Sequence, residues 1–240
     1  MENRNVWSAI ASLMVASALE AQAGVVVTGW SFNGPQGTSS PWVGVGTAST
    51  VGSATANFAA GSPADTSAPS SSENKGWNIA GFASQGTASG ERGVQFACST
   101  LGYDSIAVTW QERHSNSASR FVLFQYSIDG KSFTSEGLTN GGLFEASLGG
   151  DVWQAERRVD LKGIAQVAGN ASFALRIVSV FAPDSGQYLP SSPSATYGPS
   201  GTIRFDLVQV EGMPVPAPAA TALGAVGAMI AASSARRREQ

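Results

Sequence analysis

Apolar and polar side chains alternate with a period of two along residues 106–113, where Ile106, Val108 and Trp110 share one side. A strand turns successive side chains to opposite faces, so this pattern predicts a strand with one buried face. Similar segments recur along the chain, with turn residues between them. They are Val25–Phe32, Trp77–Phe82, Val94–Ser99, Ile106–Arg113, Phe121–Ile128, Val152–Leu161, Phe173–Phe181 and Thr202–Val210. Because no crossover helix is predicted between them, we expect the strands to pair antiparallel.

The expected fold is therefore all-β, with two packed antiparallel sheets in a jelly-roll-type sandwich. Phe121–Ile128 is apolar on both faces, which indicates a strand covered on both sides. In the last segment, alternation places Ile203, Phe205 and Leu207 on one face. We expect this last strand to pair with the first one.

The first 23 residues have the form of a signal peptide. A short polar start precedes an uncharged, mostly apolar stretch at residues 6–19, which is expected to form a signal helix. Ala21 and Ala23 supply the small-x-small pattern that signal peptidase accepts, so cleavage is expected before Gly24. The sequence thus predicts a signal peptide at residues 1–23, a β-sandwich domain at 24–212 and a C-terminal sorting or anchor segment at 213–240.

The C-terminal segment combines prolines, an apolar run and a basic cluster. Its prolines block a helix upstream of residue 219, and residues 219–234 carry no charge. This run is expected to form a short apolar helix that enters a bilayer, while the arginines that follow stay on the cytoplasmic side. The residues expected to act as the sorting signal are Val215, Pro216, Ala217, Pro218, Arg236, Arg237 and Arg238.

This three-part tail resembles the PEP-CTERM sorting signal of exported bacterial proteins, with Ala217 where the family has Glu. The resemblance implies transient membrane insertion, processing by an exosortase-type membrane enzyme, and delivery to the cell envelope or an extracellular polysaccharide matrix. Residues 109–119, 124–127 and 173–179 are similar to the β-sandwich bodies of such proteins. That second likeness implies a fold and a destination rather than an activity.

Composition excludes several classes of function. The chain has 17 acidic and 14 basic side chains and no basic stripe, so we do not expect a nucleic-acid partner. Cys98 is the only cysteine, which excludes an intrachain disulfide, and alternation places it on a buried face. His114 is the only histidine and is expected in a loop. One His and one Cys also argue against zinc or iron.

No catalytic or metal residue can be assigned, because no motif of nucleophilic or metal-assisted chemistry is present. We therefore expect a non-enzymatic surface or matrix protein associated with polysaccharide. One alternative is a glycan-active hydrolase or lyase, which needs two facing carboxylates. The carboxylates near predicted strands are Glu112, Glu145, Asp151, Glu156 and Asp206. A third reading is a calcium-dependent adhesion or carbohydrate-binding module, with Asp104, Asp129 or Asp184 as ligands.

Two further expectations concern single side chains. Arg176 interrupts an apolar strand and is expected to pair with an acid, Asp206 or Glu112. Trp42 and Trp153 lie beside turn residues and are candidates for exposed rings that stack on sugars, although a core position is favoured for each. Trp110, by contrast, is expected in the core.

Overall fold

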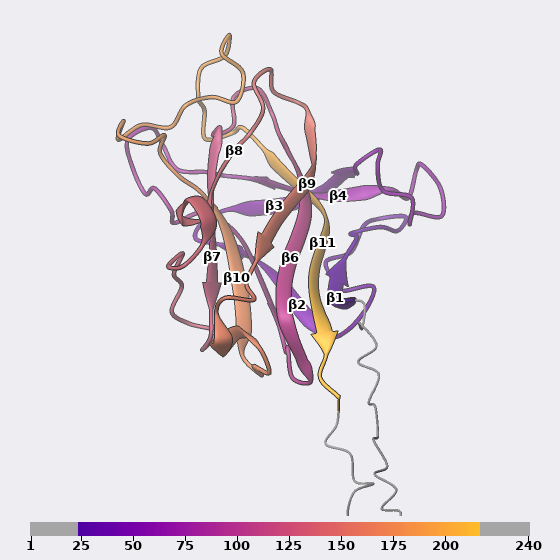
Figure 1. Ribbon diagram of the computed structural model, residues 1–240. Coiled ribbons are helices and arrows are strands. Elements are labelled where there is room, and N and C mark those ends of the chain that lie inside the picture. Colours follow the sequence, from indigo (N-terminus) through magenta and orange to yellow (C-terminus); the bar gives the residue numbers. More distant parts are fainter. Residues whose placement is uncertain (1–23, 217–240) are drawn as a thin grey trace, which may run out of the picture.

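The computed structural model describes residues 24–216, which form a sandwich of two antiparallel β-sheets (Figure 1). The predicted all-β, two-sheet architecture is confirmed. Sheet A has the order β3-β4-β11-β6-β9, with β1 paired beside β11. Its strands are β1 (Val25–Trp30), β3 (Thr55–Ala60), β4 (Lys75–Ala80), β6 (Tyr103–His114), β9 (Trp153–Asp160) and β11 (Ile203–Pro214).

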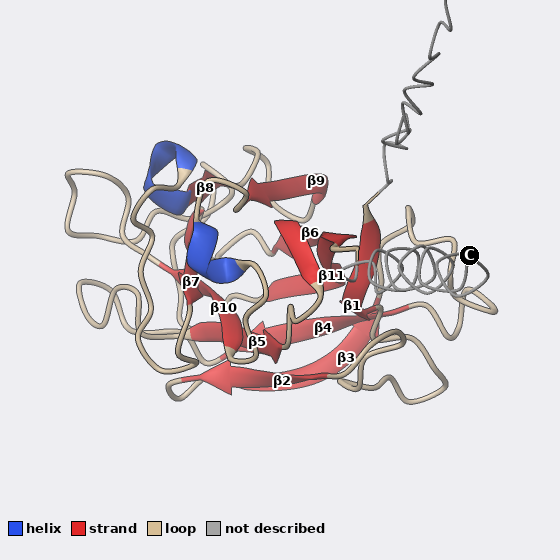
Figure 2. Ribbon diagram, turned by 60° about the horizontal axis from the view of Figure 1, so that its bottom comes forward, coloured by secondary structure: helices blue, strands red, loops and turns tan. Residues whose placement is uncertain are grey.

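Sheet B has the order β2-β5-β10-β7-β8. Its strands are β2 (Gly46–Val51), β5 (Gly93–Cys98), β7 (Phe121–Ser127), β8 (Leu143–Glu145) and β10 (Phe173–Ser179). Two 3-10 turns, η1 (Thr139–Gly142) and η2 (Ala165–Val167), lie on the β7/β8 side and are blue in Figure 2. Within residues 24–216, no helix is long and apolar enough to cross a membrane.

The last strand, β11, organises sheet A. One edge pairs with β6, and the other pairs first with β4 and then with β1, which confirms the expected pairing of the first and last strands (Figure 1). The strand runs to Pro214, and the Val215 N–H donates to the Gly102 carbonyl at 2.8 Å. The sheet therefore continues past the expected domain end at Gly212.

The expected face of Leu207 is wrong, because β11 carries a bulge. Leu207 has φ +43°, and the register between β11 and β6 shifts just after Asp206. The extra residue reverses the alternation, since Phe205 and Val208 both face the core while Leu207 is partly exposed. A bulge cannot be read from a two-residue period, which is why the sequence pattern failed here.

The core between the sheets is rich in aromatic side chains. Trp30 and Phe96 have ring centroids 4.9 Å apart, and Trp110 stacks on Phe124 at 5.6 Å. All four are almost completely buried, so these pairs join sheet A to sheet B. The position expected for Trp110 is confirmed.

Most of the residues predicted to act in targeting lie in parts of the chain that the structure does not describe. Gly24, Val215 and Pro216 lie within the described residues. The signal helix, the C-terminal helix and Ala21, Ala23, Ala217, Pro218, Arg236, Arg237 and Arg238 lie outside them. Cleavage and sorting at these residues stay predictions.

Candidate functional site

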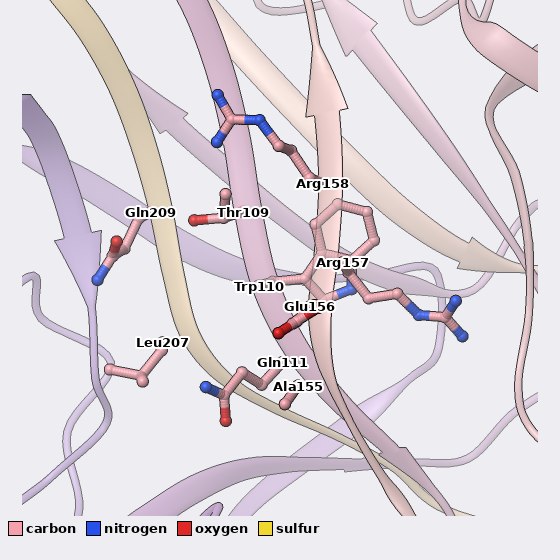
Figure 3. A pocket seen from close by; sticks show the side chains of 9 residues that line it. All are labelled: Thr109, Trp110, Gln111, Ala155, Glu156, Arg157, Arg158, Leu207 and Gln209. Carbon is pink, nitrogen blue, oxygen red and sulfur yellow. The ribbon is translucent and has the colours of Figure 1, made fainter. Parts of the chain in front are cut away.

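A groove of about 400 Å³ crosses β9, β6 and β11 in sheet A (Figure 3). The alternation of β6 creates it, because Trp110 turns into the core while Thr109 and Gln111 turn outward. The bulge in β11 adds Leu207 to the same surface. The other outward-facing lining residues come from β9 and β11: Glu156, Arg158 and Gln209.

Part of this surface is a row that runs straight across four strands. Gly29 pairs with Gln209, Gln209 with Thr109, and Thr109 with Arg158. Paired residues of antiparallel strands point to the same face of a sheet, so the row presents its side chains together. Arg158 Nη1 donates to Glu211 Oε2 at 2.7 Å, and the Thr109 hydroxyl donates to Glu211 Oε1 at 3.3 Å. Glu211 therefore orients two members of the row.

Gln111 contributes a buried acceptor that has no partner. The side chain is 9% exposed and lines the groove, and its Oε1 atom accepts no hydrogen bond within the described part of the chain. A buried polar atom normally has a partner, because leaving it unpaired costs about 1–3 kcal/mol. Because Oε1 itself has less than 1 Å² of exposed surface, a ligand donor reaches it only when the Gln111 side chain turns into the groove.

Trp42 lies beside this groove and is 54% exposed, so the core position favoured for it from the sequence is wrong. A Cβ added to Gly29 would stand 2.8 Å from Trp42 Nε1, so the indole occupies the space that a side chain at Gly29 would fill. Gly29 pairs with Gln209 on the neighbouring strand, about 4.8 Å away. The exposed ring and the polar row are therefore neighbours. Trp153, the other candidate, is only partly exposed.

The charges around the groove are mixed. Arg158 is paired with Glu211, and Glu156 adds one exposed carboxylate. Arg157 also lines the groove, but it is paired with Glu112. The polar side chains of Thr109, Gln111 and Gln209 are uncharged groups that can both donate and accept hydrogen bonds. This arrangement suits an uncharged, hydroxyl-rich ligand better than an ion.

Glu112 was a candidate catalytic carboxylate, but it is fully buried. It accepts hydrogen bonds from Trp110 Nε1 and Arg157 Nε, both at 2.9 Å, and His114 Nε2 lies 3.3 Å from it. Burial raises the Glu112 pKa, but His114 and Arg157 outweigh burial and hold the pKa below its usual value. The group is a closed ion cluster without access for a substrate.

The expected loop position of His114 is wrong. His114 is the last residue of β6 and is 1% exposed, and its Nδ1 donates to the Ser119 carbonyl at 2.6 Å. The alternation of β6 continues to its end and turns His114 inward beside Glu112. Sequence analysis missed this cluster, although the two-residue period of Trp110, Glu112 and His114 was the available signal.

Asp206, a second carboxylate candidate, is also fully buried. Its carboxylate accepts hydrogen bonds from the backbone N–H of Ser62 at 2.7 Å and of Leu207 at 2.8 Å. Burial nevertheless raises the pKa of Asp206 to about 7. Asn74 Oδ1, which has no partner, lies next to it, since a Cβ added to Gly61 would clash with both side chains.

Of the other candidate carboxylates, two lie beside an arginine. Glu145 lies 3.9 Å from Arg120, and Asp151 forms an ion pair with Arg113. Of the five candidate carboxylates, only Glu156 lines the groove among the residues that the structure describes.

The candidate calcium ligands do not form a cluster within residues 24–216, where no three His, Cys, Asp or Glu side chains come together as a metal site. Asp129 instead closes the turn after β7, because its Oδ1 accepts from the N–H groups of Lys131 and Ser132. Cys98 is buried, as predicted, and burial raises the pKa of its thiol to about 11.

The expected acid partner of Arg176 is wrong. Arg176 lies in the middle of β10, and its core-facing neighbours Leu175 and Ile177 leave it on the outer face of sheet B. Both Asp206 and Glu112 are elsewhere, and Arg176 forms no ion pair with any described residue. Its Nε donates to Gln95 Oε1 at 2.8 Å.

No family model and no curated protein matches this chain. Among solved structures, the CBM22-1 xylan-binding domain of Paenibacillus barcinonensis Xyn10C has 12% identity and a TM-score of 0.42, covering 82% of this chain and 100% of that one. The mannan-recognising module TmCBM27 has 10% identity and a TM-score of 0.39, covering 79% and 98%. A putative sugar-binding protein from Bacteroides thetaiotaomicron has 10% identity and a TM-score of 0.41, covering 78% and 95%. Likenesses at this level do not bear on what the groove binds.

Proposed function

We propose that this protein is a non-enzymatic polysaccharide-binding component of the cell envelope or extracellular matrix, built on a jelly-roll-type sandwich. The groove in sheet A is its glycan site. One observation carries the proposal: the exposed Trp42 indole lies beside the polar row of Gln209, Thr109 and Arg158 that lines the groove.

Sugars have an apolar face of C–H groups and a rim of hydroxyls. An exposed indole offers a flat apolar surface for the first, and amide side chains offer donors and acceptors for the second. Trp42 and the side chain of Gln209 provide both kinds of surface about one strand spacing apart, and Gln111 lies one strand further on, in β6. The paired charge of Arg158 favours a neutral glycan.

The test is a glycan-array screen of the full chain, followed by titration of the best neutral ligand. We expect Trp42→Ala and Gln209→Ala to weaken binding at least tenfold, and Trp42→Phe to weaken it less, because a ring is kept. Gly29→Ala should also weaken binding, since its Cβ displaces the indole.

Leu148→Ala is the matched control, because Leu148 is another exposed apolar side chain and does not line the groove. Loss of binding in Trp42→Ala, Gln209→Ala and Gly29→Ala but not in this control would support the site. Full affinity in Trp42→Ala and Gln209→Ala, or no glycan binding by the wild-type chain, would refute it.

The destination is a proposal of its own, and the sequence of the tail supports it. Signal peptidase would cut before Gly24, and an exosortase-type enzyme would process the segment after transient membrane insertion. Replacing Arg236, Arg237 and Arg238 by Ala, followed by cell fractionation, tests this. We expect unprocessed protein to accumulate in the membrane fraction, and unchanged processing and localisation would contradict the proposal.

A further inference from the structure

The outer face of sheet B carries a second polar row, on the opposite layer from the groove. Ser49 pairs with Gln95, Gln95 with Arg176, and Arg176 with Gln125, so the four residues stand side by side across β2, β5, β10 and β7. All four are at least partly exposed. Arg176 is the charged member of this row.

The Arg176 guanidinium is held in place. Its Nε donates to Gln95 Oε1, and its central carbon lies 3.7 Å from the ring centroid of Phe133. Such stacking fixes the plane of the guanidinium and covers one of its faces. The Nη groups of Arg176 donate to no acceptor within the described residues, so the outer fork is free.

Two other arginines show that a guanidinium whose Nη groups have no acceptor is unusual within the described chain. Arg92 and Arg204 also lack a carboxylate within ion-pair distance, but in each an Nη group donates to a backbone carbonyl: Gly81 and Phe82 for the first, Ala60 for the second. In Arg176, no Nη group donates to a backbone carbonyl of the described residues. Burial lowers the pKa of Arg176, which shows that its charge is partly desolvated without a compensating anion.

We propose that Arg176 binds the carboxylate of an acidic polysaccharide on the outer face of sheet B. A free guanidinium fork matches a planar carboxylate with two parallel hydrogen bonds. Ser49, Gln95 and Gln125 supply neutral donors and acceptors for hydroxyls on either side. This site goes beyond the neutral-glycan groove, because it lies on the other sheet and selects a different ligand class.

The surrounding surface favours a glycan over an acidic peptide. An extended peptide usually binds by adding a strand to a sheet edge, and β10 lies inside sheet B with partners on both sides. The next row, which includes Val178 and Leu123, is apolar and continues into a cluster with Phe121. Val178 is buried and Leu123 is partly exposed, so only part of this row is open to the apolar face of a sugar.

Affinity electrophoresis of the full chain tests this site, with polygalacturonate, dextran sulfate, dextran and polyglutamate as separate gel additives. We expect polygalacturonate to retard the wild-type chain and Arg176→Gln to weaken that retardation at least tenfold. Arg176→Lys should lose at least threefold, because an ammonium lacks the fork. Should Arg176→Gln not fold, judged by thermal unfolding, Arg176→Lys decides the question.

Lys131→Gln is the matched control, because it removes one exposed positive charge from the same hairpin as Phe133. It should leave retardation unchanged, and so should Trp42→Ala, which separates this site from the groove. Equal losses in Lys131→Gln and Arg176→Gln, or no loss in Arg176→Gln, would overturn the proposal. Equal retardation by dextran sulfate would refute the preference for carboxylate, and equal retardation by polyglutamate would refute the glycan.

Discussion

Two buried carboxyl groups, Asp206 and Glu112, have pKa values shifted in opposite directions, so they make opposite contributions to stability. Asp206 keeps its proton up to a pH of about 7, whereas the unfolded chain releases it near pH 4. Between these values the folded state binds more protons, so the free energy of unfolding falls as pH rises. Above pH 7 both states are ionised and this dependence ends.

Asp206→Asn should therefore stabilise the protein at pH 8, by about 4 kcal/mol at most. The Asn side chain keeps one oxygen for the N–H group of either Ser62 or Leu207, which donate to different oxygens of Asp206, so the loss of one hydrogen bond reduces the gain from removing the buried charge. Urea unfolding at pH 4.5 and pH 8 measures this, with the advantage of the variant expected only at the higher pH. A variant that is less stable than the wild type at pH 8 would show that Asp206 is ionised and needed as such.

Glu112 has a lowered pKa, so its contribution is present at neutral pH and is lost as pH falls through the folded pKa. Glu112→Gln removes the charge that compensates Arg157 in a fully buried site, and we expect a loss of about 3–5 kcal/mol at pH 7. The difference from the wild type should shrink below pH 4. Thermal unfolding across this range measures it, and a constant difference would contradict the ionic explanation.

At the scale of one element, the bulge in β11 sets which side chains face the core. Leu207 holds a left-handed conformation that costs a residue with a Cβ about 1 kcal/mol or more. Leu207→Gly should therefore raise the melting temperature by about 2–4 °C, and Leu207→Val should lower it, because a branched Cβ fits this conformation worse. A lower melting temperature in the Gly variant would show that the side chain contributes more than the strain costs.

Strands that bury large side chains were easier to predict from the sequence than strands with small, exposed ones. Residues 106–110 of β6 and 173–177 of β10 place large residues in the core at every second position, so their period was clear. Residues 46–60 form β2 and β3 at sheet edges with small, mostly exposed side chains, and their pattern is correspondingly weak. The conformation of an edge strand or a bulge depends on its pairing partners, which lie too far along the chain to be seen in a short stretch of sequence.

The candidate site was less predictable than the fold, for the same reason. Trp42 could be suspected from its turn, but its place beside Gln209 depends on Gly29, which lies next to it only through the pairing of β1 with β11. Arg176 was misjudged, because its neighbours Gln95 and Phe133 come from other parts of the chain. A site that is formed by residues paired across several strands can be predicted only when the pairing register of those strands is known.

At the scale of the whole molecule, the fold closes only when its last strand is present. β11 pairs with β1, β4 and β6, and the register joins Val25 to Gly212 across nearly the full domain. A chain ending at Gly201 should therefore lack a cooperative thermal transition, while one ending at Pro216 should keep it. Circular dichroism melting of both truncations measures this. Cooperative unfolding of the shorter chain would contradict the central role of β11.

The same arrangement determines how the domain would respond to mechanical load. A pull on the chain just after Pro214 runs along the axis of β11, which has antiparallel neighbours on both edges. When the domain is held at the opposite end of sheet A, the ladder bonds on both sides resist together in shear, whereas a load between Gly24 and Pro214 would open the pairing of β1 with β11 one bond after another. Within the six-stranded sheet, the strand that completes folding is thus also the one best placed to withstand tension from the C-terminal side.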